Sequence, residues 1–285
     1  MQLYSVNAGN FKLDGGAMFG VVPKSIWNRS NPADENNMCS WSMRCLLIED
    51  GDRLILIDNG MGDKQDAKFF GHYYLHGNDT LEKSLAAQGF TPDDITDVFL
   101  THLHFDHCGG SIKKEGDTLI PTFKNAIFWS NEAHWDWATN PNEREKASFL
   151  KENILPIEAS GQLSLINTPE SHFTKNGLLH TASFANNIDI RFVHGHTEKM
   201  MLPQIQYKGH TIVFLADLLP SVGHLPLPYV MSYDMFPLTT LTEKNPFYRR
   251  LLKISMCSFL STMLCMSALN LFKRKRELDR EQGLL

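Results

Sequence analysis

The feature that most constrains this chain is a dense group of metal-binding side chains between residues 101 and 110. The run reads Thr-His-Leu-His-Phe-Asp-His-Cys-Gly-Gly, and three imidazoles with a carboxylate at this density are typical of a transition-metal site. Alternate side chains of an extended segment face the same way, so we expect His102 and His104 to bind one ion together. Asp106 and His107 follow where the chain turns, and we expect them to reach a second ion.

The apolar runs of the chain predict a mixed fold with a site at one edge of a sheet. A helix is predicted over residues 142–154, which start just after Pro141 and end before Pro156. Strands and helices without strict alternation favour a layered α/β or α+β domain. Two of the predicted strands end at polar residues, and the carboxyl ends of strands are where α/β proteins place their chemistry. The predicted strands are Arg44–Ile48, Leu54–Asp58, Asp97–Thr101, Ala126–Ser130, Ile188–Val193 and Thr211–Ala216.

Charge and cysteine content argue against some classes of protein. The chain has 27 Lys and Arg against 32 Asp and Glu, a formal net charge of −5, which argues against nucleic-acid binding through a basic surface. Its five cysteines are an odd number without a paired framework, so a reducing compartment fits best. The first residues lack a basic segment followed by an apolar run, and no signal peptide is predicted. We therefore expect a cytoplasmic protein.

Four separated motifs resemble those of the metallo-β-lactamase superfamily. The first is the His-x-His-x-Asp-His pattern of residues 102–107, which follows an apolar strand ending in Thr. The others are Leu56–Gly60, Gly195–Thr197 and Phe214–Asp217, in the order that the superfamily uses. The resemblance covers roughly residues 1–244. It implies an α/β (α+β) fold, the four-layer αβ/βα sandwich of this superfamily, with the site at one edge.

The resemblance also gives each motif residue a role. The carboxylate of Asp58 is expected to orient ligand histidines from behind, because a ligand imidazole needs its other ring nitrogen fixed. Zinc is the metal that the superfamily implies, with two ions, and iron is the alternative. The ligands that it implies are His102, His104 and His196 for the first ion, Asp106 and His107 for the second, and Asp217 between the two.

Residues near the later motifs are weaker candidates. His194 precedes the Gly-His-Thr motif, and since the pattern uses only the later histidine, we expect His194 not to be a ligand. His224 follows Asp217 by seven residues and is a candidate for an additional ligand or for the pocket wall. The apolar stretch 226–234 is the best candidate for the substrate-facing wall, with Tyr233 either as a hydrogen-bond donor to an oxyanion or as a packing residue.

The expected function is hydrolysis of an ester-like bond in a small molecule. In the superfamily two ions share a hydroxide that attacks the substrate, and Asp106 would assist proton transfer to the leaving group. The segment Ala216–Pro220 looks like the branch of acyl-homoserine lactonases and organophosphate hydrolases, which favours a lactone or a carboxylic ester. A thioesterase of glyoxalase II type is one alternative. An iron-dependent sulfur dioxygenase is another, but it would not use Asp106 as a ligand, so the presence of Asp106 beside His107 favours the dinuclear hydrolase.

One departure from the superfamily keeps a non-enzymatic interpretation open. Relatives usually carry a last histidine well after the bridging aspartate, and residues 225–285 contain no histidine. With His224 set aside, the second ion is one ligand short. In that case the chain is a metal-binding protein with an incomplete second site and little activity.

Residues 245–285 differ in kind from residues 1–244. They hold 8 Lys and Arg against 3 Asp and Glu, whereas the first 244 residues hold 19 against 29. One interpretation is a C-terminal membrane anchor, since residues 254–272 are uncharged and residues 273–276 are basic. The many serines make this segment a poor apolar span, so we favour a shifted reading frame instead. A membrane is an expected partner only if the anchor interpretation holds.

We expect the coding DNA to carry a second reading frame near codon 260 that encodes the missing ligand. Residues 257–263 can be written TGT TCT TTC TTG AGC ACG ATG, and two bases later the same letters read Phe-Phe-Leu-Glu-His-Asp. This is an apolar strand followed by the kind of segment in which similar proteins carry their last metal histidine. Sequencing the DNA tests the expectation. If the alternative frame holds no Glu-His-Asp, the frameshift is excluded and the anchor interpretation replaces it.

Overall fold

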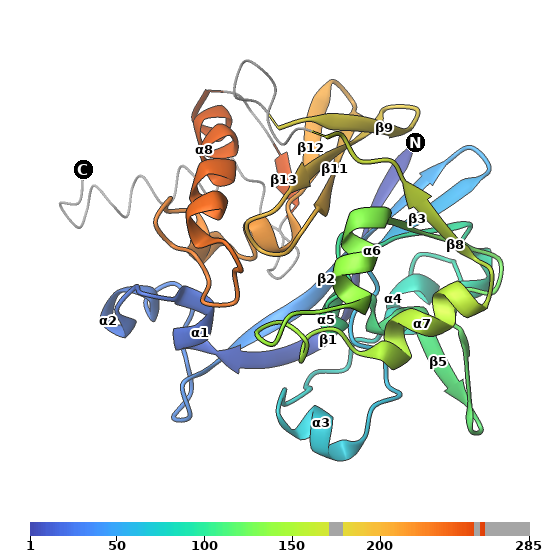
Figure 1. Cartoon of the computed structure of the whole chain (residues 1–285), viewed down its shortest axis with the longest axis horizontal. Coiled ribbons are helices and arrows are strands. Elements are labelled where there is room, and N and C mark those ends of the chain that lie inside the picture. Colours follow the sequence, from blue (N-terminus) through green and yellow to red (C-terminus); the bar gives the residue numbers. More distant parts are fainter. Residues whose placement is uncertain (171–178, 254–256, 260–285) are drawn as a thin grey trace.

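The computed structural model describes residues 1–170, 179–253 and 257–259, and two β-sheets form its centre (Figure 1). The first sheet has the strand order β1 (Gln2–Asp14), β2 (Met38–Asp50), β3 (Arg53–Ile57), β4 (Asp97–Phe99), β7 (Ile127–Asn131) and β8 (Leu163–Ile166). The second has the order β13 (Cys257–Phe259), β12 (His210–Phe214), β11 (Met200–Tyr207), β10 (Ile188–Val193) and β9 (Thr181–Ala185). A small hairpin is formed by β5 (Ile112–Glu115) and β6 (Thr118–Pro121).

Helices lie on both outer sides of the pair of sheets. In Figure 1, α4, α6 and α7 lie on the side of the first sheet, and α8 lies on the side of the second. The helices are α1 (Gly15–Phe19), α2 (Lys24–Trp27), α3 (Ala67–Gly71), α4 (Leu81–Ala86), α5 (Phe105–Cys108), α6 (Glu132–Thr139), α7 (Lys151–Ala159) and α8 (Pro237–Lys253). Short 3₁₀ turns are η1 (Pro92–Asp94), η2 (Gly109–Ser111), η3 (Ala216–Leu218) and η4 (Val222–His224).

The alternation of side chains along β2 explains the layers. Leu46 and Ile48 lie in a core with apolar residues of β10, β11 and β12, between the two sheets. Cys45 and Leu47 lie in a separate core with residues of α4, α6 and α7. Because successive side chains of a strand face opposite sides, the first sheet is buried on both faces. Two facing sheets with helices outside them confirm the predicted mixed α/β fold.

The predicted strands are all present with shifted ends, but other strands of the structure, β1 and β11 among them, were not predicted. β1 is 13 residues long and pairs with β2 in antiparallel register. Its register shifts between Asn7 and Asn10, and Gly9 lies within this irregularity. These polar and small residues interrupt the apolar alternation that predicts a strand, which is why the sequence pattern there is weak.

The helix predicted over residues 142–154 is wrong at both ends. The side-chain Oδ1 of Asn142 accepts hydrogen bonds from the backbone N–H groups of Arg144 and Glu145, at 2.9 and 3.1 Å. This turn competes with helix formation, so α7 begins only after it. The helix then continues through Pro156, whose missing N–H removes a single helical hydrogen bond.

The change in composition predicted at residue 245 falls inside α8, which runs on to Lys253 without a break. Glu243 is buried in this helix, and its carboxylate accepts hydrogen bonds from the backbone N–H groups of His194 and Gly195, at 2.7 and 3.0 Å. The first two turns of α8 therefore support the loop that follows β10. The division of the chain at residue 244 stays a prediction.

The last described segment is β13, which runs parallel to β12 with Phe259 opposite Phe214. It joins the second sheet next to the strand that precedes Asp217. Most of the segment 254–272, on which both the anchor and the frameshift interpretations depend, lies outside the described residues. Within residues 1–170, 179–253 and 257–259, no helix has the length and apolarity needed to cross a membrane.

Asp97, at the start of β4, is a buried carboxylate with hydrogen-bond partners from two other strands. Both of its carboxylate oxygens accept hydrogen bonds from Arg53, at 3.0 and 2.7 Å, and the indole of Trp129 donates another at 2.8 Å. Burial raises the pKa of Asp97, but the bonds from Arg53, Thr96 and Trp129 outweigh it and lower the pKa below its usual value. The ionised form of Asp97 is therefore part of the stability of the first sheet.

We expect Asp97→Asn to lower the free energy of unfolding by about 2 kcal/mol at pH 7, because a charged acceptor of several hydrogen bonds is lost. The lowered pKa means that the wild-type advantage is full above pH of about 4 and narrows as the pH falls further. Urea unfolding at pH 7 and at lower pH measures both effects. Asp117→Asn, at an exposed position, is the matched control. Equal stability of Asp97→Asn and the control at pH 7 would contradict the expectation.

Candidate metal centre

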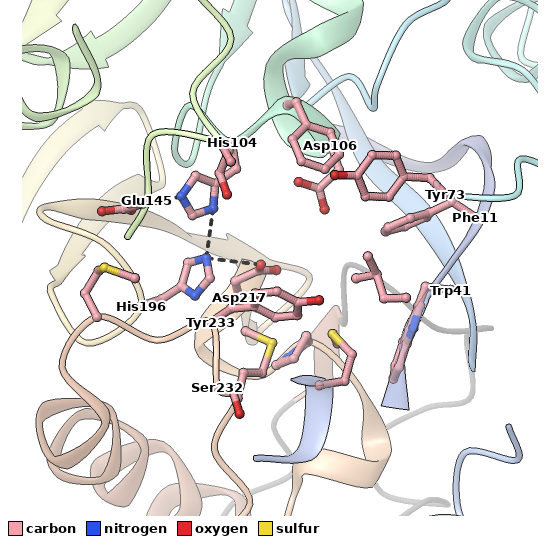
Figure 2. A pocket seen from close by; sticks show the side chains of 18 of the residues that line it. Phe11, Trp41, Tyr73, His104, Asp106, Glu145, His196, Asp217, Ser232 and Tyr233 are labelled. Atoms are coloured by element: carbon pink, nitrogen blue, oxygen red, sulfur yellow. Dashed lines mark hydrogen bonds and ion pairs between the residues drawn. The ribbon is translucent and has the colours of Figure 1, made fainter. Parts of the chain in front are cut away.

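The predicted metal-binding residues come together from loops at the carboxyl ends of three strands. His102 and His104 follow β4, and His196 follows β10. Asp106 lies in α5, and Asp217 lies in η3, just after β12. Figure 2 shows His104, Asp106, His196 and Asp217 around one cavity. Since β4 belongs to the first sheet and β10 and β12 to the second, the centre lies where the edges of the two sheets meet.

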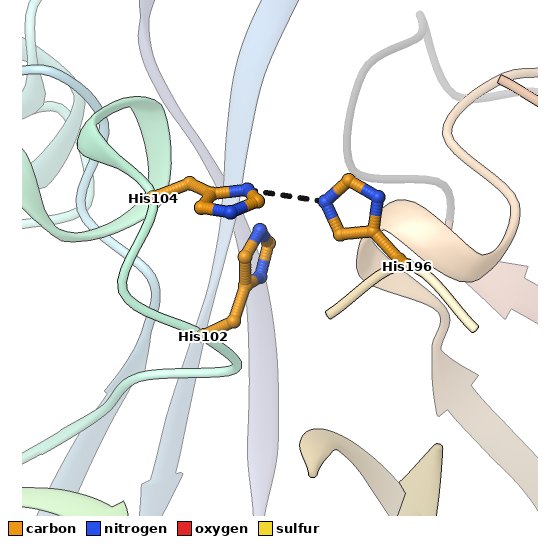
Figure 3. A group of neighbouring side chains, drawn as sticks. All are labelled: His102, His104 and His196. Carbon is orange, nitrogen blue, oxygen red and sulfur yellow. Dashed lines mark hydrogen bonds between the residues drawn. The ribbon is translucent and has the colours of Figure 1, made fainter. Parts of the chain in front are cut away.

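The first group of candidate ligand atoms belongs to His102, His104 and His196, which converge in Figure 3. One ring nitrogen of each lies within 4.8 Å of the others, and all three side chains are buried. His196 Nε2 is 3.1 Å from His104 Nδ1. Three imidazole nitrogens at this spacing are the ligand set of many zinc centres.

A second group joins His102, His107 and Asp217, again within 4.8 Å of one another. The two carboxylate oxygens of Asp217 face different groups. Oδ2 lies 3.3 Å from His196 Nε2 and Oδ1 lies 3.3 Å from His107 Nε2. Asp106 approaches the same nitrogen of His107 to 3.6 Å. Asp217 thus lies between the two groups, where one carboxylate could bind two ions.

Two acidic residues that the sequence did not single out stand behind the first group. His104 Nε2 donates to Glu145 Oε1 at 2.9 Å, and His196 Nδ1 donates to Asp234 Oδ1 at 2.9 Å. Burial raises the pKa of Glu145, but its hydrogen bond with His104 and its other partners lower it to about 2, so Glu145 is ionised. Asp234 lies in the stretch 226–234 that was predicted to face the substrate, whereas nothing in the sequence pattern marks Glu145.

Asp58 supports the other two histidines, as the resemblance implied for the metal ligands in general. His107 Nδ1 donates to Asp58 Oδ2 at 2.8 Å. The same carboxylate accepts hydrogen bonds from the backbone N–H and the hydroxyl of Thr101, both at 2.9 Å. Because that hydroxyl gives its hydrogen to Asp58, it accepts from His102 Nδ1, which lies 3.1 Å away.

These outer partners leave the inner ring nitrogens free to bind a cation. A carboxylate only accepts hydrogen bonds, so each supported histidine carries a proton on its outer nitrogen. His196 Nε2 and His104 Nδ1 then face each other at 3.1 Å, and a proton or a metal ion must lie between them. His102 Nε2 is buried and has no hydrogen-bond partner in the described part of the chain. The residues of the first group therefore fit a transition-metal ion.

Electrostatics distinguish the histidines of the centre. Burial lowers the pKa of His102 well below its usual value, and the neighbouring histidines lower it further. Burial also acts to lower the pKa of His107, but nearby carboxylates, Asp217 first, raise it well above the usual value. Asp217 has a lowered pKa, because His107 and His196 outweigh its burial. A metal ion that binds His107 must therefore displace a proton, and metal affinity falls as the pH falls.

The second position offers fewer nitrogen ligands than the first. The group there consists of His102, His107 and Asp217, and no other histidine, cysteine or acidic residue of the described part of the chain joins it. Asp106 lies beside it, 3.6 Å from His107 Nε2. The sequence itself has no histidine after residue 224. The second position is therefore a partial fit to a metal ion, as the departure in the sequence predicts.

His224 does not supply the missing ligand, so that hypothesis is wrong. Its Nε2 donates to the backbone carbonyl of Met18 at 2.8 Å, and its Nδ1 accepts from the hydroxyl of Ser221 at 2.7 Å. Burial lowers the pKa of His224 to about 3, and its ring stacks on Phe19 at 4.3 Å. Both ring nitrogens are occupied, which makes this a structural histidine. His194 lies outside both groups, with Nδ1 3.0 Å from Glu198 Oε1.

A cavity of about 350 Å³ opens above the centre, and Figure 2 shows its walls. His104, Asp106, His196 and Asp217 form its floor, and Tyr233 lies on its wall. Burial, followed by Tyr73, Asp14 and Asp106, raises the pKa of Tyr233 to about 12, so its phenol keeps its proton. Much of the remaining lining is apolar and consists of Phe11, Leu13, Met18, Trp41, Phe105 and Met231.

We expect the double change of His102 and His104 to Ala to abolish binding at the first position, because two of its three imidazoles are lost. Metal content by mass spectrometry and a chelator competition measure the effect. The double change of His72 and His210 to Ala removes two exposed histidines and is the matched control. Unchanged metal content in the first variant would contradict the assignment of the centre.

Comparisons with known proteins agree with the fold. Residues 44–278 match the profile described as the metallo-beta-lactamase superfamily. The N-acyl homoserine lactonase AiiA of Bacillus thuringiensis subsp. kurstaki is 28% identical over 165 residues, which are 54% of this chain and 56% of the relative. The chain thus spans about half the length of the curated relatives that it matches.

Two solved structures resemble this one over most of its length. A probable metal-dependent hydrolase from Staphylococcus aureus has a TM-score of 0.81 and 27% identity, covering 92% of this chain and 88% of that one. AidC, described as a dizinc quorum-quenching lactonase, has a TM-score of 0.71 and 20% identity over 91% of this chain and 86% of its own. At that identity AidC supports the fold alone. With its profile match over residues 44–278, the chain belongs to the metallo-β-lactamase superfamily.

Proposed function

We propose that this chain is a metal-dependent hydrolase that cleaves an ester-like bond, with a lactone or a carboxylic ester as the substrate. The observation that carries the proposal is the position of Asp217. Its Oδ2 lies 3.3 Å from His196 Nε2 and its Oδ1 lies 3.3 Å from His107 Nε2, and Asp217 lines a cavity. A carboxylate between two ligand groups is the arrangement of a dinuclear hydrolytic centre.

The side chains of the centre are proposed to bind two metal ions. His102, His104 and His196 would hold the first ion, and Asp106 and His107 would hold the second less completely, with Asp217 between them. Zinc is the proposed metal, with iron as the alternative, and the bound ions supply Lewis acidity and the activation of water. The remaining steps are positioning and proton transfer by side chains around the cavity.

Asp106 and Tyr233 are the proposed catalytic side chains. Asp106 lines the cavity, where it would accept the proton released by the attacking water and pass it to the leaving oxygen as the ester bond breaks. Tyr233 keeps its phenolic proton near neutral pH, so it can donate a hydrogen bond to the carbonyl oxygen as negative charge develops there. The apolar wall, with Trp41 and Phe11, excludes water and receives the apolar part of the substrate.

Two features support this choice among the alternatives. Relatives that share about half of their length with the chain are named N-acyl homoserine lactonase, which favours a lactone over the thioester of a glyoxalase II-type enzyme. Asp217 also lies 3.3 Å from Nε2 of His107. His107 is not one of the three histidines that a mononuclear iron dioxygenase would use, so this contact favours a centre with a second ion. A metal-binding protein with little activity is the outcome expected if the partial second position holds no ion.

We expect Asp217→Ala to lower kcat/KM at least about 10-fold, because loss of a shared ligand costs no less than loss of an outer-shell partner. His194→Ala, which changes a histidine outside both groups, is expected to cost no more than about threefold. Both variants are assayed on a panel of lactones, carboxylic esters and thioesters, with zinc and with iron. Hydrolysis of thioesters alone would favour the thioesterase. Equal losses, or a larger loss for His194→Ala, would contradict the assignment of His196 and Asp217.

A further inference from the structure

His134, at the start of α6, contacts both loops that carry the first group of candidate ligands. The backbone N–H of Leu103 donates to His134 Nε2 at 2.9 Å, and His134 Nδ1 donates to the backbone carbonyl of Glu198 at 2.6 Å. Leu103 lies between the two histidines that follow β4, and Glu198 lies two residues after His196. One imidazole thus bridges a loop of the first sheet and a loop of the second.

Asn131, the last residue of β7, reinforces the same bridge. Its Oδ1 accepts the backbone N–H of His134 at 2.9 Å and caps α6, and its Nδ2 donates to the backbone carbonyl of Lys199 at 2.9 Å. Asn131 is 0% exposed and His134 is 1% exposed, so water does not replace these hydrogen bonds. The beginning of α6 therefore holds residues 198 and 199 from two side chains.

The bridge has a defined chemical form. His134 accepts at Nε2 and donates at Nδ1, which is possible only for a neutral ring with its proton on Nδ1. Burial lowers the pKa of His134 to about 4, in agreement with a neutral ring. Since both ring nitrogens are occupied, His134 is not a ligand itself, although its ring centroid is only 6.4 Å from that of His102.

We propose that His134, held by Asn131, is a positioning residue that fixes the separation between His104 and His196 and thereby sets the affinity and geometry of the first metal position. The proposal rests on the metal centre proposed above. The nitrogens that must converge come from two different sheets, and a shift of one loop by a fraction of an ångström degrades the coordination of a transition-metal ion. The two hydrogen bonds of His134 oppose such a shift directly.

The test compares two substitutions of His134, one that keeps hydrogen-bonding groups in the side chain and one that removes them. The amide of His134→Gln offers one acceptor and one donor, whereas His134→Leu offers neither. We expect His134→Leu to raise the zinc Kd of the first position about 10- to 100-fold and to change the visible spectrum of the cobalt-substituted protein. We expect His134→Gln to recover most of the affinity and the spectrum. His210→Leu, at an exposed position of β12, is the control and should leave both unchanged.

A second variant keeps the proposal testable if His134→Leu does not fold. Asn131→Asp retains the oxygen that caps α6 but loses the donor to the carbonyl of Lys199, so only the contact with the second loop is broken. We expect the zinc Kd to rise about tenfold, while circular dichroism shows that the helical content is unchanged.

The outcomes separate this proposal from the function proposed above. If the wild-type chain binds no transition metal, the assignment of the metal centre is wrong, and the positioning role of His134 is wrong as well. If the wild type binds zinc and the folded variants of His134 and Asn131 bind it with the same Kd and cobalt spectrum, the metal centre stands and the positioning role is wrong. Equal losses in His134→Gln and His134→Leu would likewise overturn the hydrogen-bonded bridge.

Discussion

Four buried imidazoles, those of His102, His104, His107 and His196, direct their inner nitrogens toward one space. The outer nitrogen of each ring then needs a hydrogen-bond acceptor from the surrounding structure. A buried ring N–H costs free energy unless it is hydrogen-bonded, so an acceptor stands behind each ring. Asp58 comes from the end of β3, Glu145 from the loop before α7 and Asp234 from the loop before α8. The segments that carry Asp58, Glu145 and Asp234 supply no candidate ligand, but they contact the ligand histidines directly.

The sequence predicted those parts of the centre that are local in the chain. His102 and His104 face one space because alternate residues of an extended segment do so, a property of the backbone alone. The mixed fold followed from the apolar runs, and β2 shows why, since its alternate residues fill two different cores. His196 and Asp217 were identified through the resemblance, because no spacing rule connects them with the histidines after β4.

Partners that are distant in the chain could not be predicted in this way. Glu145 lies 41 residues from His104, in a segment that was predicted to be helical and instead turns at Asn142. No motif in the sequence marks His134, and its contacts depend on where α6 begins relative to two other loops. His224 was a candidate ligand because it lies close to Asp217 in the sequence. Its ring is directed toward the backbone carbonyl of Met18 instead, and the sequence separation does not determine that direction.

The origin of the first group from two sheets has a consequence for folding. A metal ion bound by both His104 and His196 is a cross-link between β4 and β10, whose sheets are otherwise joined by apolar packing and a few hydrogen bonds. A ligand that binds only the folded chain stabilises it in proportion to the logarithm of its free concentration. Metal binding would then raise the free energy of unfolding and lower the rate of proteolysis through opened states.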